Sequence, residues 1–170
     1  MSYHEQITDN QARLIRVSDL FFVASADPEL VDGPHDVGPV NISPKGSTKL
    51  HIIDQNHVAY LDFGGSGDET GRHARLGGPV TVMVCSFEED EAAIVRLYGY
   101  GKILPVDDPS LSESFREEIG GELIMRPRRV IVVHVARTQT SCGYGLPVMK
   151  KIRERRKEDR GRNYWEHKDK

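Results

Sequence analysis

Short apolar runs rich in Val, Ile, Tyr and Phe recur along this chain, and turn-forming residues separate them. Such a pattern is typical of a protein built mainly from β-strands. Strands are predicted over seven runs, at 20–25, 39–43, 49–54, 57–63, 80–87, 93–104 and 129–139. Gln55 and Asn56 lie between two of these runs, which predicts a tight hairpin at that point.

The alternation of apolar and polar residues is clearest in the run at 93–104. One face of this strand carries Val95, Leu97, Gly99, Gly101 and Ile103, and polar side chains occupy the other face. Glycines on an inward face let a strand bend sharply or let another backbone approach closely. The run therefore favours a small curled barrel over a flat sheet.

Few helices are predicted. Residues 9–17 form one candidate, and a second begins near Pro109 and Ser110 and ends at Gly120–Gly121. The strands do not alternate with long helices, which argues against a doubly wound parallel sheet. The expected fold class is mainly β, a mostly antiparallel barrel with a few peripheral helices.

The 170 residues fit one domain, and the net charge of -3 is unevenly spread. Residues 150–170 carry ten basic and five acidic side chains, which leaves 13 basic and 21 acidic ones, a net charge of -8, in the rest. The acidic body argues against nucleic acid as the main partner, because duplex binding depends on neutralising phosphates. The basic tail is expected to be a solvated, partly frayed helix.

Two cysteines, Cys85 and Cys142, are too few for a disulfide scaffold and indicate a reducing compartment. The first residues are too polar for a signal peptide, and no apolar run is long enough to span a membrane. We therefore expect a cytoplasmic protein that has no membrane partner. The seven histidines include no recognised metal-binding pair, so no metal site is expected.

The segment GGSGDETGRHARLGG, at 64–78, is the first candidate for binding chemistry. Asp68 is suited to cap a short helix that Gly77 and Gly78 would end. Hydroxyls, basic side chains and free amides at such a turn favour a phosphate group. The glycine spacing matches no known nucleotide-binding loop, so a capped surface turn is the competing interpretation.

Three other segments add polar side chains at strand ends. Asn41 and Ser43 share one strand face and Lys45 follows, so this corner could meet the glycine-rich segment across the barrel, or serve only as a hairpin connection. Cys142 has no identifiable His or Asp partner, and we expect it to pack or to line a ligand rather than to act as a nucleophile. MRPRR, at 125–129, could grip an anion, although a solvated turn is the preferred interpretation.

The motifs VNISPKG, YLDFGGSGDETGRHARLGG, LYGYGKI and TQTSCGYGLP follow one another in an order that resembles the FMN-binding split-barrel superfamily. Within it, the chain is most similar to the pyridoxamine 5'-phosphate oxidase-like branch. The resemblance implies a six-stranded antiparallel split barrel and a homodimer, with one FMN in each of two clefts at the subunit interface. The split-barrel domain would span 1–148, and 149–170 would be its basic C-terminal helix or tail.

The resemblance also assigns cofactor contacts by position. Asn41, Ser43 and Lys45 would line the flavin ring, ribityl chain and phosphate, with Tyr60 near the ring. The residues that match the phosphate-binding segment are Ser66, Glu69, Thr70, Arg72 and His73. The residues that would reach a flavin from the partner subunit, or close the pocket, are Gln139, Ser141 and Cys142.

The implied function is that of an FMN-dependent oxidoreductase that acts on a small organic substrate, with NAD(P)H or another reductant. The chemistry would belong to the cofactor, so no catalytic side chain is assigned. A non-catalytic flavin carrier or redox sensor is the alternative. A deazaflavin, haem or a cofactor-free dimer also stay open, and the sequence does not identify the substrate.

Overall fold

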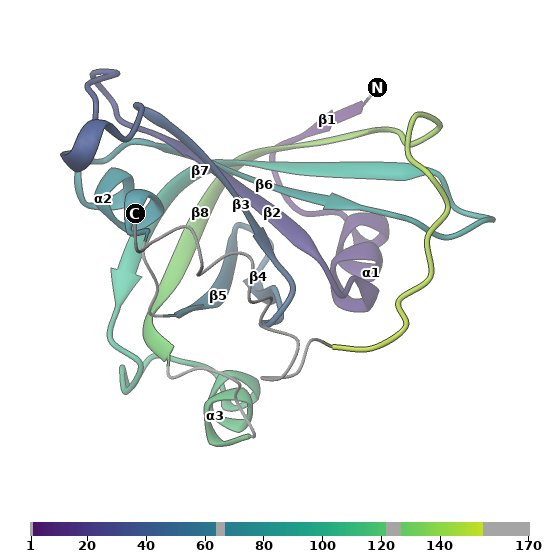
Figure 1. The fold of residues 1–170 in the computed structure, drawn as a ribbon. Helices are drawn as coiled ribbons and strands as arrows, with labels where there is room; N and C mark the ends of the chain where they lie inside the picture. Colours follow the sequence, from purple (N-terminus) through teal and green to yellow (C-terminus); the bar gives the residue numbers. More distant parts are fainter. Residues whose placement is uncertain (1, 64–66, 122–126, 155–170) are drawn as a thin grey trace.

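The computed structural model describes residues 2–63, 67–121 and 127–154 (Figure 1). Within them, eight strands are formed: β1 (Ser2–His4), β2 (Phe21–Ala26), β3 (Val40–Lys45), β4 (His51–Asp54), β5 (His57–Phe63), β6 (Pro79–Cys85), β7 (Ala93–Leu104) and β8 (Pro127–Cys142). The helices are α1 (Asp9–Val17), α2 (Glu69–Arg75) and α3 (Glu113–Gly120), with a short 3-10 turn at Pro34–Asp36. The basic C-terminal helix or tail is expected at 149–170; residues 149–154 form no helix or strand, and residues 155–170 lie outside the described residues.

The mainly β, antiparallel fold class is confirmed. All seven predicted runs form strands, the hairpin turn falls at Gln55–Asn56, and both predicted helices are present. The resemblance implied six strands, whereas the described residues form eight. Each of the seven predicted apolar runs pairs with a neighbour, and β1 pairs with β8. No helix in the described part of the chain is long and apolar enough to cross a membrane.

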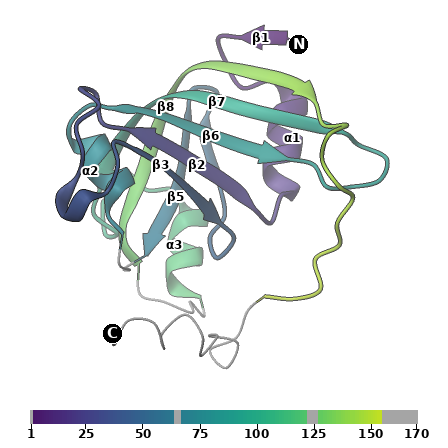
Figure 2. The same ribbon diagram turned by 45° about the horizontal axis from the view of Figure 1, so that its top comes forward.

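The strands form one sheet in the order β3-β2-β6-β7-β8-β5-β4, and all neighbours are antiparallel. The sheet curls until its two ends face each other (Figure 1 and Figure 2). Phe21 on β2 and Tyr60 on β5 are separated by three strands along the sheet, yet their ring centres lie 5.5 Å apart. This contact requires a barrel-like closure around one core.

Helices cover the openings and the outer face of this barrel. Leu14 and Ile15 of α1 are buried in the same core as the strands. On the other side, Phe115 of α3 packs with Leu61 and Val130, so β5 and β8 are also buried on their outer face (Figure 1). Residues from both faces of β5 are therefore shielded from water, which explains its nearly continuous apolar sequence.

The alternation predicted for β7 is confirmed, since Val95 and Leu97 are buried on the inner face. The pairing register with β8 shifts between Tyr98 and Gly99. A Cβ atom at Gly99 would lie 1.8 Å from the carbonyl oxygen of His134, so the close approach of the two backbones requires glycine there. This β-bulge bends the two longest strands and helps the sheet to curl.

We predict that Gly99→Ala lowers the free energy of unfolding by roughly 3 kcal/mol, because β7 and β8 must separate to admit the methyl group. Urea denaturation measures the change. Gly38→Ala is the matched control, because no atom lies within 4 Å of its added Cβ, and its effect should stay within ~0.5 kcal/mol. Equal stability of the two variants would contradict the proposed origin of the bend.

Candidate functional site

A cleft of about 330 Å³ opens between β3 and the start of α2, and we call it the β3–α2 cleft. Its walls are the inner side of β3 and the turn after it, the end of β5, residues 67–71 and Arg129. The polar corner at Asn41, Ser43 and Lys45 meets the glycine-rich segment here, which is one of the two arrangements that the sequence left open. Asn41 Nδ2 donates a hydrogen bond to Thr70 Oγ1 at 3.1 Å, which joins β3 directly to α2.

Charged side chains form the floor of the cleft. Arg129 is 5% exposed and binds Asp62 at 2.7 Å and also Asp68. Lys45 Nζ lies 3.7 Å from Asp62 Oδ1, and Arg128 donates to Asp62 and to the carbonyl of Gly67, each at 3.3 Å. Lys45, Arg128 and Arg129 thus converge on Asp62 and Asp68, and Glu69 also lines the cleft, so the charges balance and Lys45 is the lining cation held most loosely.

Asp68 occupies the predicted position before α2, but its carboxylate makes no bond to the first turn of the helix. It binds Arg129 and Arg75 instead. Burial alone would raise the pKa of Asp68, but the bonds and charges of Arg129, Arg75 and Arg128 together outweigh burial and hold the pKa below its ordinary value. The carboxylate therefore stays ionised and fixes the buried guanidinium.

The hydroxyl of Thr70 is held by a directional chain of hydrogen bonds. Arg72 Nη2 lies 2.9 Å from His73 Nε2, and His73 Nδ1 lies 2.9 Å from Ser25 Oγ. Because a guanidinium only donates, Nε2 accepts and Nδ1 carries the proton that Ser25 receives. Ser25 in turn donates to Thr70 at 3.5 Å. Since Asn41 and Ser25 both donate to the Thr70 oxygen, its own proton is left to donate into the cleft.

Arg72 and His73 support the cleft from behind rather than line it. Arg72 is paired with Asp27 at 2.7 Å, and His73 is fully buried. Burial, together with the neighbouring Arg72 charge, lowers the pKa of His73, so its ring is neutral. Glu69 lines the cleft, whereas Ser66 lies outside the described residues.

Tyr60 also lies away from the cleft lining. Its ring is fully buried in the core, and Lys45 Nζ lies 5.7 Å from the ring centre. Within the described residues its hydroxyl has no hydrogen-bond partner. Burial, followed by the charge of Asp62, raises the pKa of Tyr60 well above its ordinary value. The side chain therefore supports the floor as a neutral aromatic ring.

The last three predicted contacts lie at the far end of β8. Gln139 accepts a bond from Tyr98 at 2.5 Å, Ser141 accepts one from Arg96 at 3.0 Å, and Cys142 is exposed. Gln139 is ten residues from Arg129 along one strand, a span of roughly 30 Å. One chain does not bring these residues into its own β3–α2 cleft.

The sequence assigned no role to Asp62, and to Arg129 only the less favoured role of gripping an anion within MRPRR, although both line the cleft. The preferred interpretation of MRPRR as a solvated turn is wrong for Arg129, which is buried. Residues 122–126 lie outside the described residues. Asp62 and Arg129 lie directly opposite each other in the register of β5 and β8. The opposite charges at the ends of these two apolar runs were the sequence signal for this ion pair.

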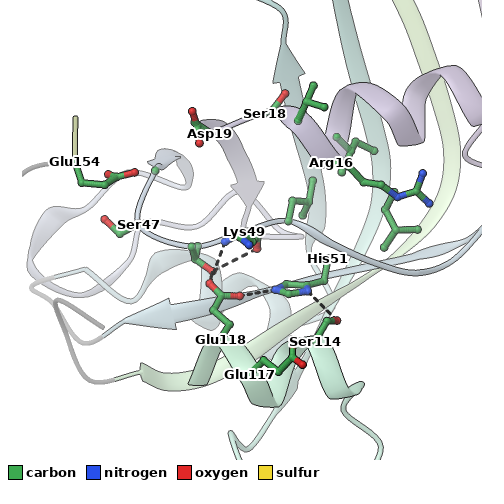
Figure 3. Close-up of a pocket in the computed structure, with 16 residues that line it drawn as sticks. Arg16, Ser18, Asp19, Ser47, Lys49, His51, Ser114, Glu117, Glu118 and Glu154 are labelled. Atoms are coloured by element: carbon green, nitrogen blue, oxygen red, sulfur yellow. Dashed lines mark hydrogen bonds and ion pairs between the residues drawn. The ribbon is translucent and has the colours of Figure 1, made fainter. Parts of the chain in front are cut away.

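A second cavity, of about 740 Å³, lies between the end of α1, residues 46–52 and α3, and we call it the α1–α3 cavity. Gly46, Ser47 and Thr48 line both this cavity and the β3–α2 cleft. Figure 3 shows His51 between Glu118 and Ser114, with interactions to both. His51 and Glu118 lie 67 positions apart in sequence, so no local motif predicted their contact.

Among the residues with described placement, no three His, Cys, Asp or Glu side chains gather in a way that would hold a metal ion.

No family model matches the chain. A curated Aspergillus flavus protein, the pyridoxamine 5'-phosphate oxidase family protein ustO, is 33% identical to it over 149 residues. This match covers 86% of the chain and 56% of the fungal protein, so the chain spans about half the length of that relative.

Two solved structures show the same fold. HupZ from Group A Streptococcus is 21% identical, with a TM-score of 0.57, and the match covers 78% of this chain and 91% of HupZ. An FMN-binding protein from Syntrophomonas wolfei is 15% identical, with a TM-score of 0.51 and coverage of 75% and 80%. The fold is thus that of the split-barrel proteins. With the sequence match, it places the chain in the pyridoxamine 5'-phosphate oxidase-like family.

We predict that part of the stability of this protein is lost between neutral and mildly acidic pH because of His73. Its pKa is lower in the folded chain, so the unfolded chain takes up a proton first as the pH falls through about 6.5. Urea denaturation at pH 7.5 and 5.5 measures the loss. His73→Gln should show a smaller loss than the unaltered chain, and an equal loss in both would contradict the assignment.

Proposed function

We propose that the β3–α2 cleft binds the phosphate end of FMN and that the chain is an FMN-dependent oxidoreductase acting on a small organic substrate. The observation that carries the proposal is the convergence of β3 and α2 on one cleft that the loosely paired Lys45 and the hydroxyl of Thr70 both line. The Syntrophomonas wolfei neighbour, described as FMN-binding, and the family of the fungal relative support it.

The residues present fit a phosphate group. Lys45 is paired only loosely with Asp62, at 3.7 Å, so its ammonium is free to approach an anion more closely. The Thr70 hydroxyl has a proton to donate, because Ser25 and Asn41 both donate hydrogen bonds to its oxygen. A Cβ atom at Gly71 would lie 2.3 Å from Arg129 Nη2, so glycine there makes room for the guanidinium beneath the cleft.

Each side chain has a separate role in this proposal. Lys45 and Thr70 bind the phosphate, and Arg129, held by Asp62 and Asp68, fixes the floor of the cleft below it. The flavin, when bound, supplies hydride or electron transfer. The chain's own contribution is to orient the group and to exclude water from it.

A homodimer would complete the site. The cleft of about 330 Å³ is at the small end of the range for ligand pockets. Gln139, Ser141 and Cys142 lie far from the cleft of their own chain, so a second copy is the source from which they would reach a flavin. The exposed Cys142 and the pair of Arg96 with Ser141 are available for such a contact.

A non-catalytic flavin carrier is the second candidate. The described lining of the β3–α2 cleft contains no histidine, cysteine or tyrosine that would exchange a proton with a substrate near neutral pH. Absorbance at the nicotinamide band, with flavin-loaded protein and NADH or NADPH, separates the two: an oxidoreductase consumes the reductant catalytically, and a carrier does not.

We predict that the purified chain binds FMN more tightly than riboflavin, because the cleft recognises the phosphate. Lys45→Ala removes one charge-assisted bond, worth about 1.5–3 kcal/mol, and should weaken FMN binding by about 10–100-fold with little effect on riboflavin. Quenching of flavin fluorescence on titration measures both affinities.

Arg13→Ala is the matched charge control for this titration. Arg13 lies on α1, outside the cleft, and forms an exposed ion pair with Glu91. Its removal should therefore leave the affinity for FMN unchanged. Equal affinity of the unaltered chain for FMN and riboflavin, or no loss in Lys45→Ala, would show that the phosphate binds elsewhere.

A further inference from the structure

The α1–α3 cavity contains an arrangement of side chains that the proposed flavin chemistry does not use. Ser114 and Glu118 lie on α3, and His51 lies on β4 between them (Figure 3). We propose that Ser114, His51 and Glu118 form a nucleophile, general base and orienting carboxylate that hydrolyse small carboxylic esters. This activity would be independent of any flavin.

Glu118 is fixed in its ionised form. Its carboxylate accepts hydrogen bonds from Thr48 Oγ1 at 2.9 Å, from the backbone amide of Lys49 at 3.1 Å, and from His51. Burial alone would raise the pKa of Glu118, and these bonds outweigh burial and lower it, the one from His51 most. A buried carboxylate with several donors is the type of group that orients a catalytic imidazole.

The ionised carboxylate determines which nitrogen of His51 carries a proton. A carboxylate only accepts, so Nε2 is the protonated nitrogen that donates to Glu118. In the neutral ring, Nδ1 then has a free lone pair, and it faces Ser114 Oγ at 3.3 Å. Hydrogen bonds of this kind often shorten when substrate binds. His51 is therefore placed to accept the Ser114 proton.

The surroundings hold the imidazole and leave the serine accessible. The His51 ring packs on Phe115 with 4.0 Å between ring centres, and the side chains of His51 and Glu118 are only 10% and 12% exposed. Ser114 is exposed at the beginning of α3, where it borders the cavity. A rigid, shielded base beside an open hydroxyl is the arrangement that activates a nucleophile.

The proposed reaction has two balanced steps. Ser114 Oγ attacks the ester carbonyl carbon while its proton moves to His51 Nδ1, and the departing alkoxide takes that proton to leave as the alcohol. Water then attacks the acyl group on Ser114 and gives a proton to His51 Nδ1. That proton returns to Ser114 Oγ as the acyl group leaves as the acid. Ester and water become acid and alcohol, and no oxidant or cofactor is consumed.

The cavity is suited to a small ester. Its volume of about 740 Å³ falls within the range of small-molecule sites. Arg16 and Lys49 line it together with Asp19, Glu117, Glu118 and Glu154, so the net negative lining favours an uncharged ester and the departure of its carboxylate product. Ser2 is an exposed serine on β1 that lines neither cavity, which makes it a matched control.

We predict that the flavin-free full chain hydrolyses p-nitrophenyl acetate, measured by nitrophenolate absorbance. Ser114→Ala should lower the rate constant by at least 100-fold, and Glu118→Gln, which still accepts from Thr48 but no longer offers a carboxylate to His51 Nε2–H, should lower it by about 10²–10⁴-fold. Ser2→Ala should retain the full rate.

Covalent labelling tests the nucleophile separately from the rate. A fluorophosphonate probe should add to Ser114 in the unaltered chain and in Ser2→Ala, as found by mass spectrometry of the digested protein, and addition should be lost in Glu118→Gln. A structural network that only attaches α3 to the sheet would give no adduct. Hydrolysis that persists in Ser114→Ala, labelling elsewhere, or no labelling would each overturn the proposal.

Discussion

The buried guanidinium of Arg129 is the constraint on which the β3–α2 cleft depends. It binds Asp62 on β5 and Asp68 just before α2, so one side chain of β8 connects three elements around the floor. Removing one partner of a buried ion pair costs about 3–5 kcal/mol, because the other charge is left unpaired. Gly71 is part of the same constraint, since a side chain there would occupy the space of the guanidinium.

The turn after β3 connects the two candidate sites. Gly46, Ser47 and Thr48 line both cavities, and the buried hydroxyl of Thr48 donates to Glu118 and accepts from the backbone amide of Leu61. One hydroxyl thus ties the turn to α3 and to β5. Because the β3–α2 cleft and the α1–α3 cavity share this wall, a rearrangement of the turn would alter both.

Several site predictions depended on an assumption about which side chains face a ligand. Thr70 and Asn41 meet at the cleft, as the strand pattern and the helix signals indicated. Arg72 and His73 were assigned to the phosphate by position, but Asp27 and Ser25 hold them behind Thr70. The sequence contains basic residues in the right segment, yet it does not say which of them already has a partner.

The sequence by itself determined the seven strands β2 to β8, the helices α1 and α3, the turn at Gln55–Asn56 and the inward face of β7, because each follows from residues close together along the chain. The tertiary structure decided the closure that brings Phe21 to Tyr60, the burial of Arg129 between two carboxylates, and the meeting of His51 with Glu118. These contacts join residues 39 or more positions apart. Their formation depends on the curl and register of the whole sheet, which no local pattern encodes.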